Sequence, residues 1–246
     1  MIPPTSIDGT DITGATIDGT DVQEITVDGD VVFTAAPTIP SGATHFYALD
    51  EGTGSVGNDS VGTLDGTITN PIWQTDSTFF GGAYLENQGS SVLNIPQQLP
   101  FNTDFTIAFT FTPSQGTPSD DSTYWQWSNS SDKLIGVVQD GSDILAHWYD
   151  GSNFQSGPTI AYPSGNEVRI WVYWDSTNQD LELRVNDNPS TGTGSDDNLG
   201  GGSSLVMMDR DTNLPDRPLP GGYDAFTIYD GIRKDPTDDY NAQPWS

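Results

Sequence analysis

The chain has 246 residues, enough for one large β domain with a small appendage or for two modest domains. Its 35 acidic residues face 7 basic ones, and the formal net charge of -28 disfavours binding to nucleic acid phosphates. The absence of cysteine excludes disulfides, thiolate metal sites and thiol catalysis. The sequence also contains no run of about 18 apolar residues that could span a membrane as a helix.

Aspartate dominates the acidic residues, because five of the 35 are glutamates, and Lys133 and Lys234 are the two lysines. Such a charge repels itself in dilute buffer, but at about 1 M salt the Debye length is roughly 3 Å and the repulsion is screened. This composition resembles that of proteins from halophilic archaea and their viruses. An ordinary acidic protein with calcium sites is the alternative interpretation.

Three near-copies of one decapeptide begin the chain, at residues 6–12, 16–22 and 26–32. In each copy β-branched residues surround an Asp-Gly pair, which predicts a short hairpin. A segment of this size cannot bury its own apolar face, so it needs copies of itself, other subunits or a larger assembly. We interpret residues 1–36 as an attachment and oligomerisation segment that makes contacts through Ile7, Ile17, Val27, Val31 and Phe33.

Residues 37–42 contain two prolines among small residues, which indicates a short linker. From residue 43 to 246, short apolar-polar runs alternate with turn signals and helical periodicity is nearly absent. Many short strands without crossover helices predict an all-β fold of antiparallel sheets, packed as a sandwich or jelly roll.

The clearest predicted strands alternate with a period of two residues. In residues 105–111 the apolar side chains at 105, 107, 109 and 111 fall on one face. Residues 168–174 place a second apolar set on one face and Arg169, Trp171 and Tyr173 on the other. Residues 181–185 follow as the expected hairpin partner.

The order of these features resembles the concanavalin A-like jelly roll, and specifically its laminin-G-like branch. The likeness spans about residues 43 to 236, and its segments are HFYALDEGTG (45–54), NDS (58–60), LDGTI (64–68), FGGAYL (80–85), FTIAF (105–109), the hairpin 171–185 and GYDAFTIY (222–229). The chain departs from that family at Thr110, where a tryptophan is usual, and at Asp224-Ala225, where Asp-Glu is usual. The decapeptides lie outside this likeness and resemble Asp-Gly-rich β segments at the virion-proximal ends of tail and capsid appendages of tailed viruses.

No catalytic residues are predicted. Glycosidases of this fold place a carboxylate pair on one strand, whereas Glu167 and Glu182 stand in separate predicted strands. His45 and His147 have neither metal-ligand spacing nor a nucleophile motif. We therefore expect a protein without enzymatic activity, in which both histidines are packed or exposed on the surface.

Calcium is the inorganic cofactor that the chain suits best, because it prefers clustered carboxylate and carbonyl oxygens on loops. The laminin-G-like resemblance implies a site in the loop after the first strand, with help from the last strand. That implies Asp50, Asp59 and Asp224 as ligands. The alternative is that a chain with so many aspartates has one in every loop.

Carbohydrate binding in this fold class uses loop aromatics that stack on sugar faces and polar groups that bind hydroxyls. We expect two such regions, each interpreted as loop or loop-adjacent. The candidate ligand-binding residues are Tyr124, Trp125, Trp127, His147, Trp148, Tyr149, Asp150 and Asn153. The alternative is that Trp125, Trp148 and Trp171 cover sheet edges or subunit interfaces.

The sequence thus predicts a virion appendage of a tailed virus infecting a halophilic archaeon, as a capsid turret, spike or tail fibre. The decapeptides would dock a trimer or pentamer to other virion proteins, and the jelly roll would bind a host surface glycan or glycoprotein. The N-terminus lacks the basic and apolar regions of a cleaved export signal, so we expect assembly in the host cytoplasm. A carbohydrate-binding or carbohydrate-active protein outside any virion is one alternative, and a purely structural capsid decoration protein is the other.

Overall fold

The computed structural model describes a set of segments that together hold all the strands below. They are residues 6–7, 10–11, 16–17, 20–21, 24–27, 30–34, 39–75, 82–88, 91–96, 103–114, 122–128, 134–149, 154–163, 167–178, 180–186, 188–193, 204–207 and 219–231. All strand pairs within them are antiparallel, and no α-helix occurs there. None of the described residues forms a helix with the length and apolar character needed to cross a membrane.

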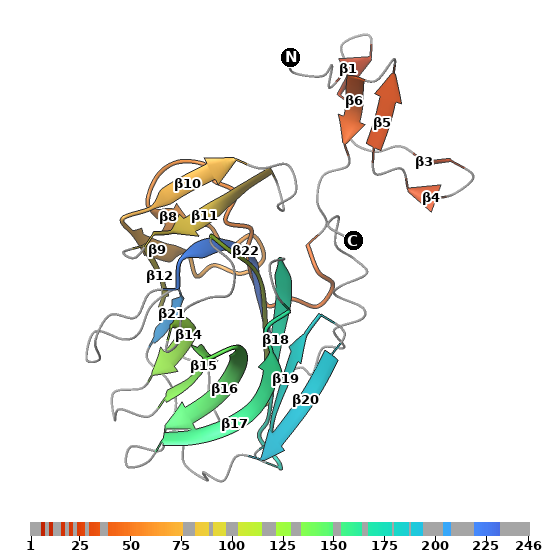
Figure 1. The fold of residues 1–246 in the computed structure, drawn as a ribbon. Coiled ribbons are helices and arrows are strands. Elements are labelled where there is room, and N and C mark those ends of the chain that lie inside the picture. The colour runs from red at the N-terminus through yellow and green to blue at the C-terminus, as the bar shows by residue number, and fades with distance from the viewer. Residues whose placement is uncertain are drawn as a thin grey trace.

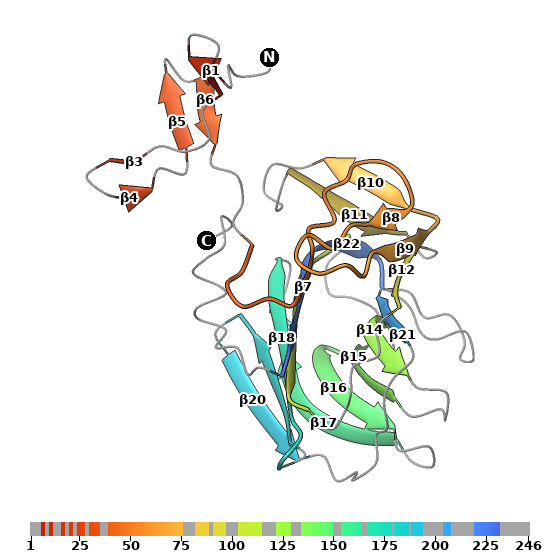
Figure 2. The same cartoon turned by 180° about the vertical axis from the view of Figure 1, so that it is seen from behind.

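Two eight-stranded sheets form the main body, and they face each other in Figures 1 and 2. The first sheet has the order β10-β11-β22-β13-β18-β19-β20, with β7 also paired to β22. Its strands are β7 (His45–Tyr47), β10 (Ile72–Thr75), β11 (Ala83–Asn87), β13 (Phe105–Pro113), β18 (Val168–Asp175), β19 (Asp180–Val185), β20 (Asn188–Thr193) and β22 (Gly221–Asp230).

The second sheet has the order β17-β16-β15-β14-β21-β12-β9-β8. Its strands are β8 (Val56–Gly57), β9 (Gly66–Thr69), β12 (Val92–Ile95), β14 (Thr123–Ser128), β15 (Leu134–Asp140), β16 (Asp143–Tyr149), β17 (Phe154–Ala161) and β21 (Ser204–Met207). The long strand β17 curves toward the first sheet and packs against β19 and β20, which closes one side of the sandwich (Figure 1). The predicted antiparallel β-sandwich is confirmed.

The predicted alternation in residues 105–111 is confirmed in β13. Its four apolar side chains at 105, 107, 109 and 111 are fully buried in the core. They lie opposite the apolar set of β18, because Ile107 pairs with Val172 and Phe109 with Ile170. The predicted hairpin of 171–185 is also present, since β18 pairs with β19 along its length.

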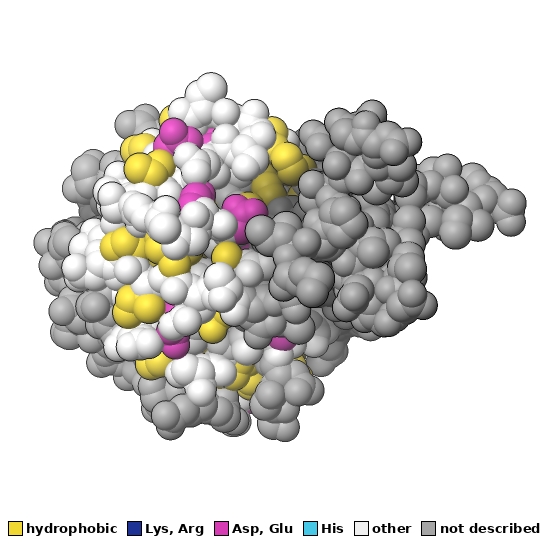
Figure 3. Space-filling model, turned by 90° about the horizontal axis from the view of Figure 1, so that it is seen from above, with side chains coloured by type: hydrophobic (Ala, Val, Ile, Leu, Met, Phe, Trp, Pro, Cys, Tyr) yellow, Lys and Arg dark blue, Asp and Glu magenta, His cyan; other side chains and the backbone are white. Residues whose placement is uncertain are grey.

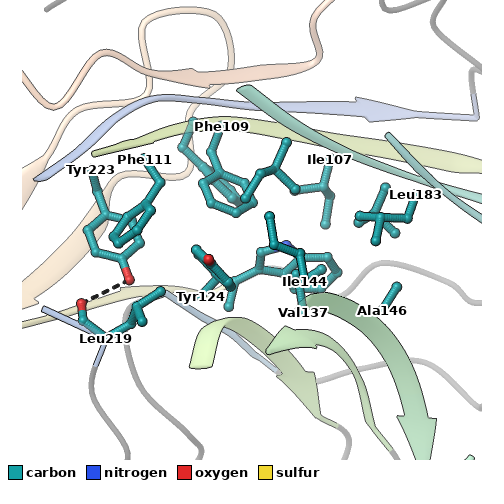
Figure 4. Close-up of a cluster of buried hydrophobic side chains, with 14 of the residues drawn as sticks. Ile107, Phe109, Phe111, Tyr124, Val137, Ile144, Ala146, Leu183, Leu219 and Tyr223 are labelled. Atoms are coloured by element: carbon teal, nitrogen blue, oxygen red, sulfur yellow. Dashed lines mark hydrogen bonds between the residues drawn. The ribbon is translucent and has the colours of Figure 1, made fainter. Parts of the chain in front are cut away.

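Aromatic rings from both sheets meet at the centre of this core (Figure 4). The ring of Phe111 on β13 meets that of Tyr124 on β14 edge-on, with 4.9 Å between ring centroids. Tyr223 on β22 lies beside Phe111 and donates its hydroxyl hydrogen bond to the carbonyl oxygen of Leu219 at 3.2 Å. These contacts bind the sheets together because each buried ring contributes a large apolar area and a favourable ring geometry.

The first sheet is buried on its other face as well. On β13, Thr106 and Thr110 point away from the core but are each 1 % exposed. Trp171 on β18 is 2 % exposed on that same face. The central strands of this sheet therefore carry side chains that are excluded from water on both faces. The two-residue periodicity of the sequence predicts burial of one face only.

The decapeptides form the three predicted hairpins. They are β1 (Ser6–Ile7) with β2 (Thr10–Asp11), β3 (Thr16–Ile17) with β4 (Thr20–Asp21), and β5 (Glu24–Val27) with β6 (Asp30–Thr34). In each hairpin the Asp-Gly pair falls between the last paired residues, as in Val27 with Asp30. The described strands of these hairpins pair with one another and join neither large sheet. The contacts predicted for five side chains of this segment stay a prediction, because these side chains are outside the described part of the structure: Ile7, Ile17, Val27, Val31 and Phe33.

Candidate functional site

The first predicted aromatic region is a strand and not a loop. Tyr124 and Trp125 lie in β14, and both are 0 % exposed. Figure 4 shows Tyr124 pointing into the space between the sheets, and its hydroxyl donates to Oε1 of Gln139 at 2.8 Å. A ring must present an open face to stack on a sugar. We therefore correct the prediction: these two side chains are part of the core.

The second predicted aromatic region is also a strand in part, and two of its residues are buried. His147 and Trp148 lie in β16 and are 2 % and 3 % exposed. Trp148 belongs to the core, whereas His147 lies on the other side of the sheet, next to Gly136 in the register of β15. A Cβ at Gly136 would meet the Trp125 carbonyl oxygen at 2.8 Å, so this glycine lets the neighbouring strands and the imidazole pack closely.

Four further candidates are placed only in part. Trp127 lies in β14 opposite Ile135, and Tyr149 lies in β16, but their side chains are outside the described part of the chain. Asp150 and Asn153 also lie outside the described residues. A sugar site built on these residues remains a prediction from the sequence.

Asp59 is the most heavily hydrogen-bonded acidic side chain of the loop between β8 and β9. Its carboxylate is fully buried and accepts five hydrogen bonds, one from Nδ1 of His45 at 2.6 Å and four from backbone amides. The four amides are those of Phe46 (3.1 Å), Val61 (3.2 Å), Gly62 (2.8 Å) and Leu64 (3.1 Å). One carboxylate thus fastens the loop to β7.

The hydrogen bonds around Asp59 stabilise the charged form of its carboxyl group. Burial raises the pKa of the Asp59 carboxyl, but the hydrogen bonds from His45, Gly62, Leu64 and Phe46 outweigh burial and lower the pKa to about 2. A Cβ on Gly62 would overlap Oδ2 of Asp59 and the imidazole of His45. The hydrogen-bonded pair of His45 and Asp59 therefore requires a residue without a side chain at position 62. His45 is therefore a packed histidine with a defined partner.

The predicted calcium ligands do not form a metal site in the described structure. The two carboxylate oxygens of Asp59 already accept five hydrogen bonds, Asp50 is exposed, and Asp224 is 0 % exposed on β22. The described residues contain no group of three or more histidine or acidic side chains that could hold a metal ion. The residues implied by the laminin-G-like resemblance therefore do not fit a shared calcium ion.

A buried arginine occupies the outer face of the first sheet, that is, the face turned away from the second sheet. Arg169 is 2 % exposed and donates through Nη1 to the carbonyl oxygen of Ala225 at 2.8 Å and to Thr110 at 3.3 Å. Its guanidinium also lies 5.5 Å from the ring centroid of Trp171. Ala225 has a φ of 48°, and the pairing of β13 with β22 shifts register there. Such a cluster fixes strand register and is closed to a ligand.

A more accessible polar surface lies on the β10–β11 hairpin, at the edge of the first sheet. Its outward side chains form what we call the hairpin face: Ile72, Gln74, Tyr84, Glu86 and Gln88. Gln88 is exposed and the other four are partly exposed. The side chains of Gln74 and Gln88 both donate to Oε2 of Glu86, at 2.7 and 3.0 Å. The sequence prediction missed this surface, because Tyr84 was interpreted only as part of the FGGAYL segment.

No family model matches this chain, and no curated protein sequence matches it. Solved structures do. One is domain 4 of AbnA, an extracellular GH43 arabinanase from Geobacillus stearothermophilus in complex with arabinotriose, with 20 % identity and a TM-score of 0.64 over 83 % of this chain and 99 % of that one. At this identity the likeness shows the fold alone.

Two other matches share that fold. The binding domain of botulinum neurotoxin serotype C1 has 12 % identity and a TM-score of 0.60, over 85 % of this chain and 53 % of that one. A Trypanosoma rangeli sialidase mutant with trans-sialidase activity has 15 % identity and a TM-score of 0.60, over 83 % of this chain and 33 % of that one. The chain therefore spans about half of the first of these structures and about a third of the second. In both, the β-sandwich is one part of a larger protein.

Proposed function

We propose that the β-sandwich is a non-enzymatic carbohydrate-binding domain. The observation that carries this proposal is the similarity to the AbnA domain, whose structure was determined with arabinotriose and which the chain covers almost completely. Two of the described carboxylates already have partners within the protein: Glu182 accepts a hydrogen bond from Nε of Arg184 at 2.7 Å, and Asp59 accepts five hydrogen bonds. Neither is placed as one of a free pair of catalytic carboxylates.

A glycan array probed with the full chain at about 1 M salt tests the proposal, because screening removes non-specific repulsion by the acidic surface. We expect saturable binding to at least one oligosaccharide class and no release of reducing sugar from it. Absence of binding to every immobilised glycan would refute the proposal. Release of reducing sugar would refute the non-enzymatic part and leave the binding part standing.

We propose attachment to a larger particle as a second function, carried by the three hairpins. In each hairpin the two described strands pair with each other and join neither large sheet, as expected for a module that makes its contacts elsewhere. A trimeric or pentameric appendage of a virus of halophilic archaea would use the module in this way. Light scattering in strong brine should show an oligomer for the full chain and a smaller species when residues 1–36 are deleted. A monomer in both cases would refute attachment through these hairpins.

A further inference from the structure

Along β10 and β11, the side chains of the hairpin face alternate with side chains that point toward the core. Leu85 on β11 is 0 % exposed, and Trp73 on β10 packs against the core. In antiparallel register Gln74 lies opposite Tyr84, and Ile72 lies opposite Glu86. Directly opposite side chains of an antiparallel pair share a face, so an aromatic ring, an amide and a carboxylate stand together on the outside of the edge hairpin.

The hydrogen bonds of this face determine which ligand groups it can receive. Gln74 and Gln88 each use Nε2 to donate to Glu86, so both amides turn donors toward the carboxylate. Their Oε1 atoms and the second oxygen of Glu86 are all acceptors. A ligand that supplies several donors close together, such as the adjacent hydroxyls of a sugar, complements this array. Tyr84 is partly exposed and lies opposite Gln74, which places an aromatic ring of the kind that can contact the C–H face of a sugar beside these acceptors.

The charge of the face restricts the ligand further. Among the described residues, the arginines are Arg169, which is buried, and Arg184, which lies on β19 with three strands between it and β11. The view from above shows acidic and hydrophobic side chains among the coloured residues, with no lysine or arginine visible there (Figure 3). A carboxylate or sulfate on a sugar would meet Glu86 with no described cation beside it, and would be repelled.

We propose that the hairpin face is the glycan-binding site and that it takes neutral saccharides with adjacent hydroxyls. Tyr84 stacks on the sugar ring, while Glu86 and Gln74 accept hydrogen bonds from its hydroxyls. Acidic sugars are excluded by the charge of Glu86. This inference rests on the proposed carbohydrate-binding function and adds to it the location of the site and the ligand class.

The test uses the full chain at about 1 M salt, with an array of neutral oligosaccharides that includes arabinotriose beside sialylated ones. Titration calorimetry with the best-bound neutral sugar then compares Tyr84→Ala, Glu86→Gln and Gln74→Ala with the unaltered chain. Asn94→Ala and Thr159→Ala, exposed positions on the second sheet, serve as matched controls. Circular dichroism melts of each variant separate lost binding from lost folding.

We expect affinity for the neutral sugar to fall at least tenfold in Tyr84→Ala and about fivefold in Glu86→Gln and Gln74→Ala, with both controls unchanged. Absence of glycan binding by the unaltered chain would overturn the proposed function and this inference together. Binding by the unaltered chain that all three hairpin variants retain would overturn the site alone. Preference for sialylated over neutral sugars would overturn the ligand class.

Discussion

Replacing Asp59 tests whether one carboxylate holds the loop between β8 and β9 to the first sheet. In Asp59→Asn the buried charge is lost while the side-chain shape is kept. The pKa of about 2, against an ordinary 3.8, corresponds to about 2 kcal/mol of folding free energy. Asp59→Ala removes all five hydrogen bonds, and we expect a loss of about 3 to 5 kcal/mol.

The pH dependence gives a second readout of the same carboxylate. Its pKa is lower in the folded chain than in the unfolded chain, so its contribution is complete above about pH 4 and is lost as the pH falls toward 2. The difference in unfolding free energy between the unaltered chain and Asp59→Asn should shrink over that interval.

Urea unfolding, followed by tryptophan fluorescence at constant salt from pH 2.5 to 6, measures both quantities. Asp65→Asn is the matched control, because Asp65 is exposed and its Oδ1 accepts a hydrogen bond from the Asp59 amide at 3.0 Å. We expect a change below about 1 kcal/mol for it. An Asp59→Asn variant as stable as the unaltered chain at pH 6, or a difference that does not shrink on acidification, would refute the reasoning.

Four further predictions follow from the charge, the core and the loop. The melting temperature should rise as salt increases from dilute buffer to about 1 M, because 35 acidic residues repel one another; a thermal melt with no such rise would contradict this. Tyr124→Phe should cost about 1 to 2 kcal/mol in urea unfolding, since it removes a buried hydrogen bond to Gln139, and an unchanged midpoint would count against that bond. Gly62→Ala should destabilise the chain by about 2 kcal/mol or more in the same assay, because its Cβ overlaps Asp59 and His45, whereas Thr63→Ala should be neutral. A chelator at constant ionic strength should leave the melting temperature unchanged, and a clear fall would show a calcium site beyond the described residues.

The strands that the sequence predicted well are those whose two faces differ in polarity. Residues 105–111 and 168–174 each place four large apolar side chains at every second position, and the structure places both segments in the first sheet with that side inward. The decapeptide hairpins were predicted for a different reason, because an Asp-Gly pair between β-branched residues specifies its turn locally. In both cases the deciding information lies within a few neighbouring residues.

The site predictions failed where burial depends on contacts far along the chain. Tyr124 and Trp125 stand next to serines and aspartates, which suggested an exposed loop, but strand β14 carries both into the core against residues of β13 and β15. The laminin-G-like resemblance implies Asp59 as a calcium ligand, whereas in the structure its carboxylate is occupied by hydrogen bonds from amides of its own loop. Gln74 and Glu86 are 12 residues apart and meet only through the pairing of β10 with β11, so no local motif marks them.

Because every ten-residue unit at the N-terminus closes its own turn, its pairing does not depend on how many units precede or follow it. Gain or loss of one ten-residue unit would lengthen or shorten the N-terminal segment by one hairpin and would leave the strand pairing of the sandwich intact. The length of this segment can therefore change in steps of ten residues without any change in the β-sandwich.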